Sequence, residues 1–520
     1  MQNGPILRFD DFELDIDACE LRKRGHKVRL AHQPFRLLAM LAESSGLVID
    51  RDSIRKRLWN STFVDFEHGI NFCMCEIRRA LHDRRDRPKY VETLPRRGYR
   101  FLASVNVAGQ DGDGSPVAER RVDLADRLAQ GRRLLREMGV GTLDQARKIF
   151  EEALRLDAHC AMAHCGLGET RAMRFISRCE PGDLESAKSH LERAAVLDPE
   201  LAEPYPWLCY VYFRCGELEK SLEAGNRGVL LLPNLVYAQY FLGTAFFAAC
   251  EVGKGSYEEA VKHLTQASRI EPRWLATWFV LSLICLLNGD YEGAERFARQ
   301  LCQLEGAEGP VLRFPGAENL LGIASLRKGE TRCANEWFSR SMTKLCASDH
   351  TYAEGLKAWC ACGMGDVELR RENPGAALAH YRLAWQIVQE SPAILSQERH
   401  AARALTGLAA AYAASGECDR GRNLLSQAEQ QLQSCSRLQI SSPATGLAEL
   451  QYAFAVACVR VRDRHRALVH LREAFNAGWH DSGWLLRDSE MEPVHNEPAF
   501  FSLLEDIASS RHPLALMHII

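Results

Sequence analysis

Residues 70–101 read INFCMCEIRRALHDRRDRPKYVETLPRRGYRF, and this stretch decides the fold of the first part of the chain. Its first half carries apolar residues at helical spacing, namely Ile70, Met74, Ile77 and Leu81. This spacing predicts a helix from about residue 68 to residue 82 with one buried face. Its second half holds two short strand-forming segments, 90–93 and 99–101, on either side of the basic turn LPRRG. These segments predict a hairpin.

The residues before this stretch complete a small domain. Between residues 6 and 30, the segments ILRF, FELD, CELRKR and KVRL are separated by turn-forming residues, which predicts a small antiparallel sheet. Pro34 suits the first turn of a helix that follows. The run 50–52 is expected to cap a second helix that ends near Trp59. Sheet, three helices and hairpin together predict an α+β winged helix-turn-helix at residues 4–105.

Residues 6–103 resemble the OmpR/PhoB-type winged-helix output domain (CadC/ToxR-like) of transcription regulators. The hallmarks of that family are an N-terminal four-stranded sheet, a recognition helix that ends in R-x-A-L or a similar string, and a hairpin that ends in G-Y-R-F. This sequence has RRAL at 78–81 and GYRF at 98–101. The resemblance implies double-stranded DNA as the partner, with the third helix in the major groove and the hairpin, called the wing, in the flanking minor groove.

The resemblance also indicates which side chains contact DNA. The candidate DNA-binding residues are His68, Asn71, Cys75, Arg78, Arg79, Arg96 and Arg97. The first five lie on or near the outer face of the predicted helix, opposite its apolar face. Asn and Arg side chains offer the paired groups that fit adenine and guanine edges, so Asn71 and Arg79 are the expected base readers. Arg96 and Arg97, at the wing tip, are expected to enter a narrow groove of enhanced negative potential.

One part of the recognition helix departs from the family pattern. Cys73, Cys75 and Glu76 stand where members of the family often have basic or polar residues. Glu76 would repel a phosphate unless it accepts a hydrogen bond from a cytosine amino group or pairs with Arg79. We therefore expect a sequence preference different from that of the relatives, or a low affinity. A redox role of the two thiols stays open, because nothing in the sequence indicates a lowered thiol pKa.

Charge is unevenly distributed along the 520 residues, whose net charge is −3. Residues 1–105 hold 20 Lys and Arg against 15 Asp and Glu, a net charge of +5, and the rest of the chain is net −8. A basic domain on an acidic body indicates a polyanionic partner for that domain. The N-terminus lacks the pattern of a secretory signal, and we expect a cytoplasmic protein.

A membrane association is not expected. The strongly apolar, uncharged stretch between Arg273 and Asp290 has 16 residues, whereas a membrane-spanning helix needs about 20 apolar residues. This stretch is expected to form a buried helix of a soluble domain. Residues 106–122 are rich in Gly, Asp and Ser at their start, which predicts a flexible linker.

Residues 123–510 are predicted to be all helical and repetitive. The helix-ending positions Pro199, Pro233, Pro272 and Gly306 recur at spacings near 34 residues, which is the period of the tetratricopeptide repeat. Small residues stand where paired helices approach closely, at Ala146, Ala187, Ala260, Ala294 and Ala334. Eight or nine helical pairs and a closing C-terminal element are expected. The fold class is therefore mainly α, with an all-α, tetratricopeptide-like superhelical solenoid after the winged helix.

The solenoid is expected to bind a protein or peptide partner on its concave face. Several aromatic residues are candidates for that face, although packing between helices explains them as well: Tyr205, Trp207, Tyr210, Tyr212, Tyr240, Phe246 and Trp278. RNA polymerase is a further possible partner of the regulator, and the sequence does not indicate an oligomeric state.

The sequence contains none of the catalytic or nucleotide-binding motifs that we sought, among them a P-loop and H-E-x-x-H. We therefore expect no enzyme and no cofactor. The 18 cysteines lack the paired C-x-x-C spacing of a structural zinc site, so no metal is expected.

The leading hypothesis is a sequence-specific transcription regulator whose winged helix binds promoter DNA and whose repeats bind a partner or sense a signal. The alternative is an interaction scaffold whose winged helix no longer binds DNA. The operator, the target genes and the direction of regulation cannot be inferred from the sequence.

Overall fold

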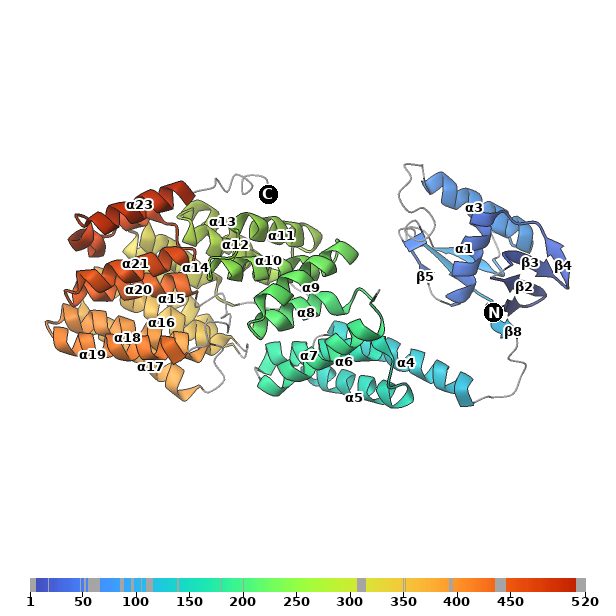
Figure 1. The fold of residues 1–520 in the computed structure, drawn as a ribbon, viewed down its shortest axis with the longest axis horizontal. Coiled ribbons are helices and arrows are strands. Elements are labelled where there is room, and N and C mark those ends of the chain that lie inside the picture. Colours follow the sequence, from blue (N-terminus) through green and yellow to red (C-terminus); the bar gives the residue numbers. More distant parts are fainter. Residues whose placement is uncertain are drawn as a thin grey trace. The chain divides into compact units, whose positions relative to one another are not determined.

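The computed structural model describes residues 6–510, except 17, 47, 51–52, 55–65, 85–87, 95–97, 104, 109–115, 138–139, 179, 200, 306–314, 349, 351, 392–395 and 435–445. The chain forms two compact units, Met1–Glu119 and Arg120–Ile520 (Figure 1). We call them the N-terminal unit and the repeat unit.

The N-terminal unit begins with an antiparallel meander. The strands β1 (Ile6–Phe9), β2 (Phe12–Asp15), β3 (Glu20–Lys23) and β4 (His26–Val28) form as predicted. Neighbouring strands place Leu7 opposite Leu14, and Leu14 opposite Leu21. These three side chains are buried, because alternate residues of a strand point to the same face of the sheet.

A fifth strand joins this sheet from the segment that we expected to be a linker. β8 (Asn106–Ala108) pairs with β1, with Ile6 opposite Ala108. In addition, α4 (Pro116–Glu137) begins before residue 122. The expectation of a linker over 106–122 is therefore wrong at both of its ends. The polar composition does not prevent the pairing of β8, because the edge of β1 offers backbone donors and acceptors that need partners.

The remaining elements of the N-terminal unit follow the predicted order. They are α1 (His32–Glu43), β5 (Val48–Ile49), α3 (Phe66–Leu81), β6 (Val91–Leu94) and β7 (Gly98–Phe101), and the three strands form a sheet in the order β5-β7-β6. Of the second predicted helix, Ser53 and Ile54 are helical. The Ser53 backbone N–H donates to Asp50 Oδ1 at 2.8 Å, as expected of a helix cap. The rest of that helix, to Trp59, lies outside the described residues.

An aromatic cluster joins the two sheets of the N-terminal unit. The rings of Phe9 and Phe101 lie 5.0 Å apart, edge to face, and Tyr90 contacts both Phe9 and Phe12 in the same manner at 5.8 and 5.6 Å. Edge-to-face pairs of this kind contribute about 1 kcal/mol beyond the burial of their area. The cluster therefore fixes the hairpin β6–β7 against the meander.

The repeat unit is helical. Its described helices are α4, α5 (Val140–Leu156), α6 (Ala161–Arg178), α7 (Pro181–Leu197), α8 (Pro204–Arg214), α9 (Leu218–Leu231), α10 (Val236–Cys250), α11 (Tyr257–Ile270), α12 (Leu275–Leu287), α13 (Tyr291–Glu305), α14 (Ala317–Arg327), α15 (Thr331–Cys346), α16 (Ala353–Arg370), α17 (Pro374–Glu390), α18 (Gln397–Ala414), α19 (Cys418–Ser434), α20 (Leu447–Arg460), α21 (Arg464–Asn476), α22 (Ser482–Arg487), the 3-10 helix η2 (Ser489–Val494) and α23 (Pro498–Ser510).

These helices form tetratricopeptide-like pairs, as predicted. From α6 with α7 to α20 with α21, each even-numbered helix packs against the next one. The even-numbered helices also pack against one another, α6 on α8, α8 on α10 and so on to α20, and so form the inner layer of the solenoid. The five small residues expected at close helix contacts are all buried: Ala146, Ala187, Ala260, Ala294 and Ala334.

A recurring contact places a large ring between glycines of two inner helices. The ring of Phe150 on α5 lies against Gly131 on α4 and Gly166 on α6, and a Cβ at either glycine would overlap it. Phe338 and Tyr381 occupy the same kind of slot, between glycines of α14 and α16 and of α16 and α18. Glycine thus acts here as a packing residue, despite its cost in helix propensity.

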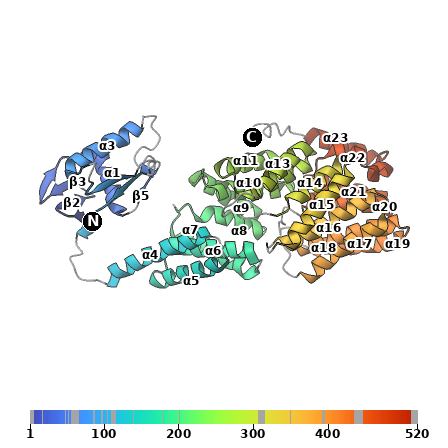
Figure 2. The same ribbon diagram turned by 180° about the vertical axis from the view of Figure 1, so that it is seen from behind.

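The last repeat and the tail pack back onto the middle of the repeat unit. The hydroxyl of Tyr257 donates to the Gly478 carbonyl at 2.6 Å, and that of Tyr291 donates to Asp481 Oδ2 at 2.5 Å. Arg327, on α14, pairs with Glu449 on α20. This ion pair brings α20 to the end of α14, and the course of the chain from α14 to α20 can be followed in Figures 1 and 2. The tail, which was expected to close the array, joins α20 in contacts with the middle repeats.

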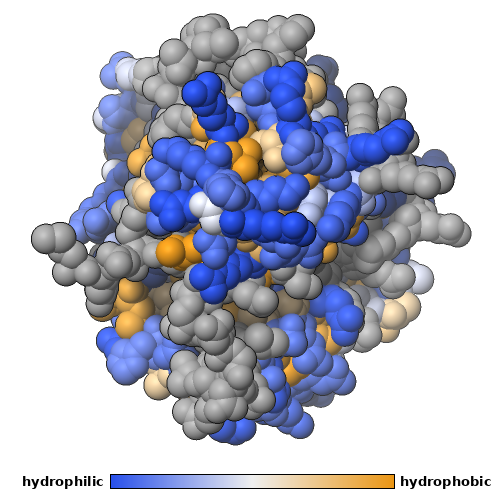
Figure 3. Space-filling model, turned by 90° about the vertical axis from the view of Figure 1, so that its right-hand side faces the viewer, coloured by the Kyte–Doolittle hydropathy of each residue, from blue (hydrophilic) through white to orange (hydrophobic). Residues whose placement is uncertain are grey.

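Among the described residues, no helix has the length and apolar character needed to span a bilayer. The uncharged stretch near Trp278 forms α12, whose residues from Thr277 to Leu287 are buried inside the repeat unit, as expected. On the face shown in Figure 3, described residues are mostly hydrophilic and apolar ones form small, separated patches.

The glycine slot around Phe150 predicts the effect of a single methyl group. Gly166→Ala should lower the free energy of unfolding of the repeat unit by about 1–3 kcal/mol, because the new Cβ has to displace a buried ring. Gly182→Ala on α7, where a Cβ meets nothing within 4 Å, is the matched control. Thermal unfolding followed by circular dichroism checks both variants. Equal midpoints for Gly166→Ala and Gly182→Ala would contradict the packing role.

Candidate nucleic-acid interface

The helix α3 has the buried face that its apolar spacing predicts. Ile70, Met74, Ile77 and Leu81 are 0–2% exposed. Cys73 shares this face at 1% exposure, and burial raises the pKa of its thiol to about 11. Its thiol is therefore a protonated core group at neutral pH, and the low-pKa thiolate of a redox-sensitive cysteine is not found at Cys73.

The opposite face of α3 presents an arginine and a thiol. Cys75 is exposed, and the Arg79 side chain is 77% exposed. Arg79 pairs with Glu76 one turn earlier on the helix, which confirms the pairing that the sequence offered as one way to accommodate Glu76. The pair orients the guanidinium along the helix and offsets the negative charge on this face.

Arg78 points toward the hairpin. Its Nη2 donates to Thr93 Oγ1 at 2.7 Å and to the Val91 carbonyl at 3.2 Å, both on β6. Arg78 was predicted on or near the outer face as a DNA contact, and the structure gives it an internal role as a brace between α3 and β6. Hydrogen bonds to a charged group contribute about 1.5–3 kcal/mol, so this brace fixes the angle between helix and hairpin.

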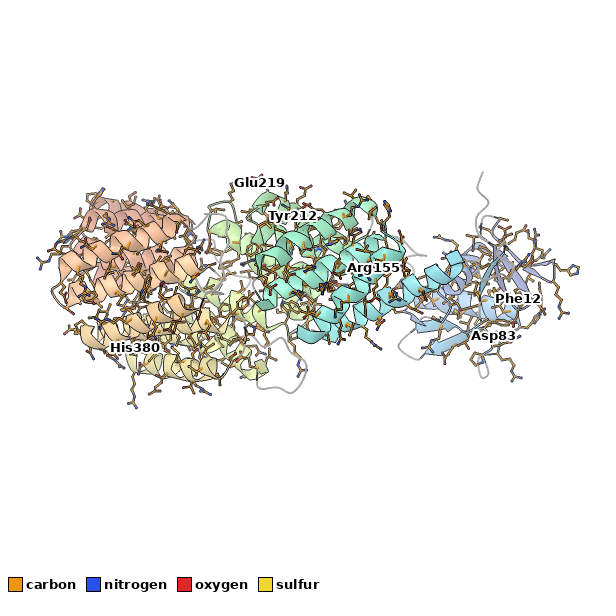
Figure 4. The ribbon with its side chains drawn as sticks, turned by 90° about the horizontal axis from the view of Figure 1, so that it is seen from below. Phe12, Asp83, Arg155, Tyr212, Glu219 and His380 are labelled. Carbon is orange, nitrogen blue, oxygen red and sulfur yellow. The ribbon has the colours of Figure 1, made fainter. Side chains whose placement is uncertain are left out.

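The end of α3 is tied to the same hairpin by a buried carboxylate. His82 adopts a left-handed conformation with φ of 55°, and the Asp83 N–H donates back to the Arg78 carbonyl at 2.8 Å, which closes the helix in a Schellman-like turn. The Asp83 carboxylate, labelled in Figure 4, accepts from the backbone N–H groups of Lys89, Tyr90 and Val91 at 2.6–3.2 Å. The start of β6 is therefore fixed relative to α3.

Two further contacts anchor the hairpin to the rest of the unit. The Tyr90 hydroxyl donates to Asp10 Oδ2 at 2.9 Å, and Lys89 Nζ pairs with the same oxygen at 2.6 Å. These hydrogen bonds, with Lys89 first, lower the pKa of the Asp10 carboxyl. At the other end of the hairpin, Gly98 has φ of +128°, and a Cβ there would overlap the Ile49 carbonyl on β5. Only glycine permits this close approach of β7 to β5.

Four of the predicted DNA-binding side chains cannot be placed. Arg96 and Arg97 lie outside the described residues, as do the side chains of His68 and Asn71. The described residues Cys75 and Arg79 do lie together on the exposed face of α3. The DNA contacts of all seven residues stay predictions.

The positioning residues Asp83, Thr93 and Tyr90 were missed by the sequence analysis. The role of Asp83 could have been inferred from its position directly after the predicted end of the helix. Short polar side chains in such positions often accept hydrogen bonds from nearby backbone N–H groups. For the hydroxyls of Thr93 and Tyr90 the sequence contains no such signal, because their partners are 15 and 80 residues away.

The repeat unit uses most of its candidate aromatic residues for packing. The indole N–H of Trp278 donates to the Pro272 carbonyl at 2.7 Å, and the Tyr212 hydroxyl donates to Glu192 Oε1 at 2.9 Å. Trp207 is buried. Among the described residues, no group of three or more His, Cys, Asp or Glu side chains has an arrangement that could hold a metal ion.

Comparison with known proteins identifies the N-terminal unit. Residues 25–101 match the family described as "Transcriptional regulatory protein, C terminal". The transcriptional regulatory protein KdpE of Mycobacterium tuberculosis is 29% identical over 99 residues, which are 19% of this chain and 44% of KdpE. The transcriptional activator CadC of Escherichia coli is 28% identical over 102 residues, which are 19% of this chain and 20% of CadC.

A solved structure matches the same region. The RstA DNA-binding domain of Klebsiella pneumoniae, in complex with the RstA box, is 25% identical and covers 19% of this chain and 96% of that chain, with a TM-score of 0.18. The chain spans less than half the length of the two curated relatives. The family that residues 25–101 match is one of transcription regulators and not a class of enzymes. The N-terminal unit therefore contains an OmpR/PhoB-type winged-helix domain, and tetratricopeptide-like helical repeats follow it in this chain.

Proposed function

We propose that this protein is a cytoplasmic transcription regulator that binds promoter DNA in a sequence-specific manner. Helix α3 enters the major groove with Asn71 and Arg79 as base readers, and the wing at 95–97 contacts the flanking minor groove. The repeats bind a protein partner or sense a signal. RNA polymerase is one candidate partner, and the proposal leaves the oligomeric state open.

The observation that carries this proposal is the rigid connection between α3 and the hairpin. Arg78, on α3, and Asp83, just after it, connect the helix to residues 89–93 at the start of the hairpin through five hydrogen bonds. A helix and a wing that contact adjacent grooves need a fixed separation, because DNA presents its grooves at a fixed spacing. The net charge of +5 in residues 1–105 supports a polyanionic partner. The alternative, a scaffold that no longer binds DNA, needs no such geometry.

The wing arginines should contribute affinity without sequence preference. We expect the full chain to bind selected duplexes in a salt-sensitive manner, and Arg96→Ala with Arg97→Ala to weaken binding to all sequences and to lower the salt slope by about 1–2. Asn71→Ala should instead relax the preference at particular base pairs. Electrophoretic shifts over a salt series measure these effects. Arg332→Ala, at an exposed arginine on α15, is the control. If the full chain binds no duplex at any salt concentration, the proposal is contradicted and the alternative, an interaction scaffold, is favoured.

The brace between α3 and the wing makes a separate prediction. Thr93→Val removes the hydroxyl that accepts from Arg78, and should lower the free energy of unfolding of the N-terminal unit by about 1 kcal/mol. Affinity for DNA should fall as well, because the wing is less well fixed relative to α3. Thermal unfolding and electrophoretic shifts test both effects. Thr343→Val, which removes a hydroxyl hydrogen bond on the exposed side of α15, is the control. Wild-type affinity in Thr93→Val would show that the brace does not position the wing.

A further inference from the structure

The repeat unit contains a cavity of about 1580 Å³ between its middle and its last repeats. Residues of the loop between α10 and α11 line this cavity, together with residues of α19, α20 and α21. We call it the closing groove. Binding pockets for small molecules usually have volumes of about 300–1,000 Å³. The closing groove is therefore large enough for a segment of polypeptide chain.

The walls of the closing groove combine apolar side chains with carboxylates. Val469 on α21 lines it and is 48% exposed. Leu432 on α19 and Phe475 on α21 line the same space and are partly buried. Glu258 on α11 and Glu473 on α21 are exposed, and neither forms an ion pair within the part of the chain that the structure describes. Such walls favour an occupant with apolar side chains and a positive charge.

The remaining arginine and carboxylate groups of the closing groove are paired with one another. Arg399 lies 3.2 Å from Glu251. Arg466 pairs with Glu429, and Nε2 of His470 lies 3.2 Å from the same carboxylate. The charge that the closing groove offers to an occupant is therefore the negative charge of its two unpaired carboxylates.

The helix α23 ends at the closing groove. It packs against α21, and both helices run in the same direction. Two ion pairs show this direction: Arg464 with Glu497, and Arg472 with Asp506. Ser510, the last residue of α23, lines the groove. The chain that follows Ser510 therefore starts at the groove, and the ten residues 511–520 can span about 33 Å when they are extended.

We propose that the segment 511–520 binds in the closing groove of its own chain. The segment reads RHPLALMHII. Arg511, at its start, supplies a positive charge beside the rim where Glu473 has no ion-pair partner. Seven of the eight residues 513–520 are apolar, and they gain from contact with Val469 and its apolar neighbours because this contact removes them from water.

Occupation by its own chain makes the closing groove a surface that can be opened. A tethered segment competes with a free peptide at an effective concentration on the order of millimolar. A partner protein therefore reaches the groove only if it binds tightly enough to displace residues 511–520. This consequence, unlike the docking itself, rests on the proposal that the repeats bind a partner.

A labelled synthetic peptide with the sequence 511–520 tests the docking on the full-length protein. We expect the double variant Leu514→Asp with Leu516→Asp, whose own segment no longer fits, to bind this peptide at least about tenfold more tightly than the wild type does. Adding Val469→Asp to the double variant should abolish binding. Adding Val196→Asp instead, at an exposed valine on α7, is the matched control and should leave it unchanged. Fluorescence anisotropy measures each affinity.

Photo-cross-linking locates the segment in the otherwise unchanged protein. With p-benzoylphenylalanine in place of Met517, ultraviolet light should cross-link residue 517 to α19, to α21 or to the loop between α10 and α11 of the same chain. Mass spectrometry identifies the linked peptides.

Four results would overturn the inference: no peptide binding by the double variant, equal binding by the wild type, binding that survives Val469→Asp, or cross-links to another region or to a second copy of the chain. Circular dichroism verifies that each variant is folded. Electrophoretic shifts with the same preparations separate this test from that of the proposed function, because every substitution lies outside the N-terminal unit.

Discussion

The buried carboxylate of Asp83 fixes the arrangement on which the proposed interface depends. It accepts hydrogen bonds from the three consecutive backbone N–H groups of Lys89, Tyr90 and Val91, which lead into β6. The last two of these N–H groups would otherwise be buried without partners. Because Asp83 also closes the C-terminal turn of α3, the same residue ends the helix and begins the hairpin. Arg78 adds a second connection one turn earlier. The helix α3 and the strands β6 and β7 are thus held in one fixed arrangement, as the proposed DNA interface requires.

The repeat unit is stabilised by a different kind of contact, the packing of large rings against glycines. Large rings such as Phe150 and Tyr381 fill slots between glycines of adjacent inner helices. Each of these rings therefore packs one helical pair against the next pair. The tail then fills the inner side of the later repeats with charged pairs and buried aromatic side chains. The inner side of the later repeats is therefore covered by the chain itself.

The parts of this structure that follow from local pattern were predictable from the sequence. The face of α3 that carries Ile70 and Met74 follows from helical spacing, and the paired helices follow from their period and their small residues. The strand β8 was missed because its partner β1 is about 100 residues away and its own composition is that of a loop. The inward turn of Arg78 was missed for the same reason. An arginine on the edge of an amphipathic helix can face solvent or a neighbouring strand, and only the position of Thr93 decides between them.

The most direct test of the central claim uses the thiol of Cys75. Cys75 is exposed on the face of α3 that we place in the major groove, and Cys333 and Cys346 on α15 are exposed far from it in sequence. Mass spectrometry can follow the alkylation of each of these thiols by N-ethylmaleimide, with and without a duplex selected for binding to the full chain. The account predicts that the duplex slows alkylation of Cys75 and leaves the rates at Cys333 and Cys346 unchanged. An unchanged rate at Cys75 in the bound complex would contradict it.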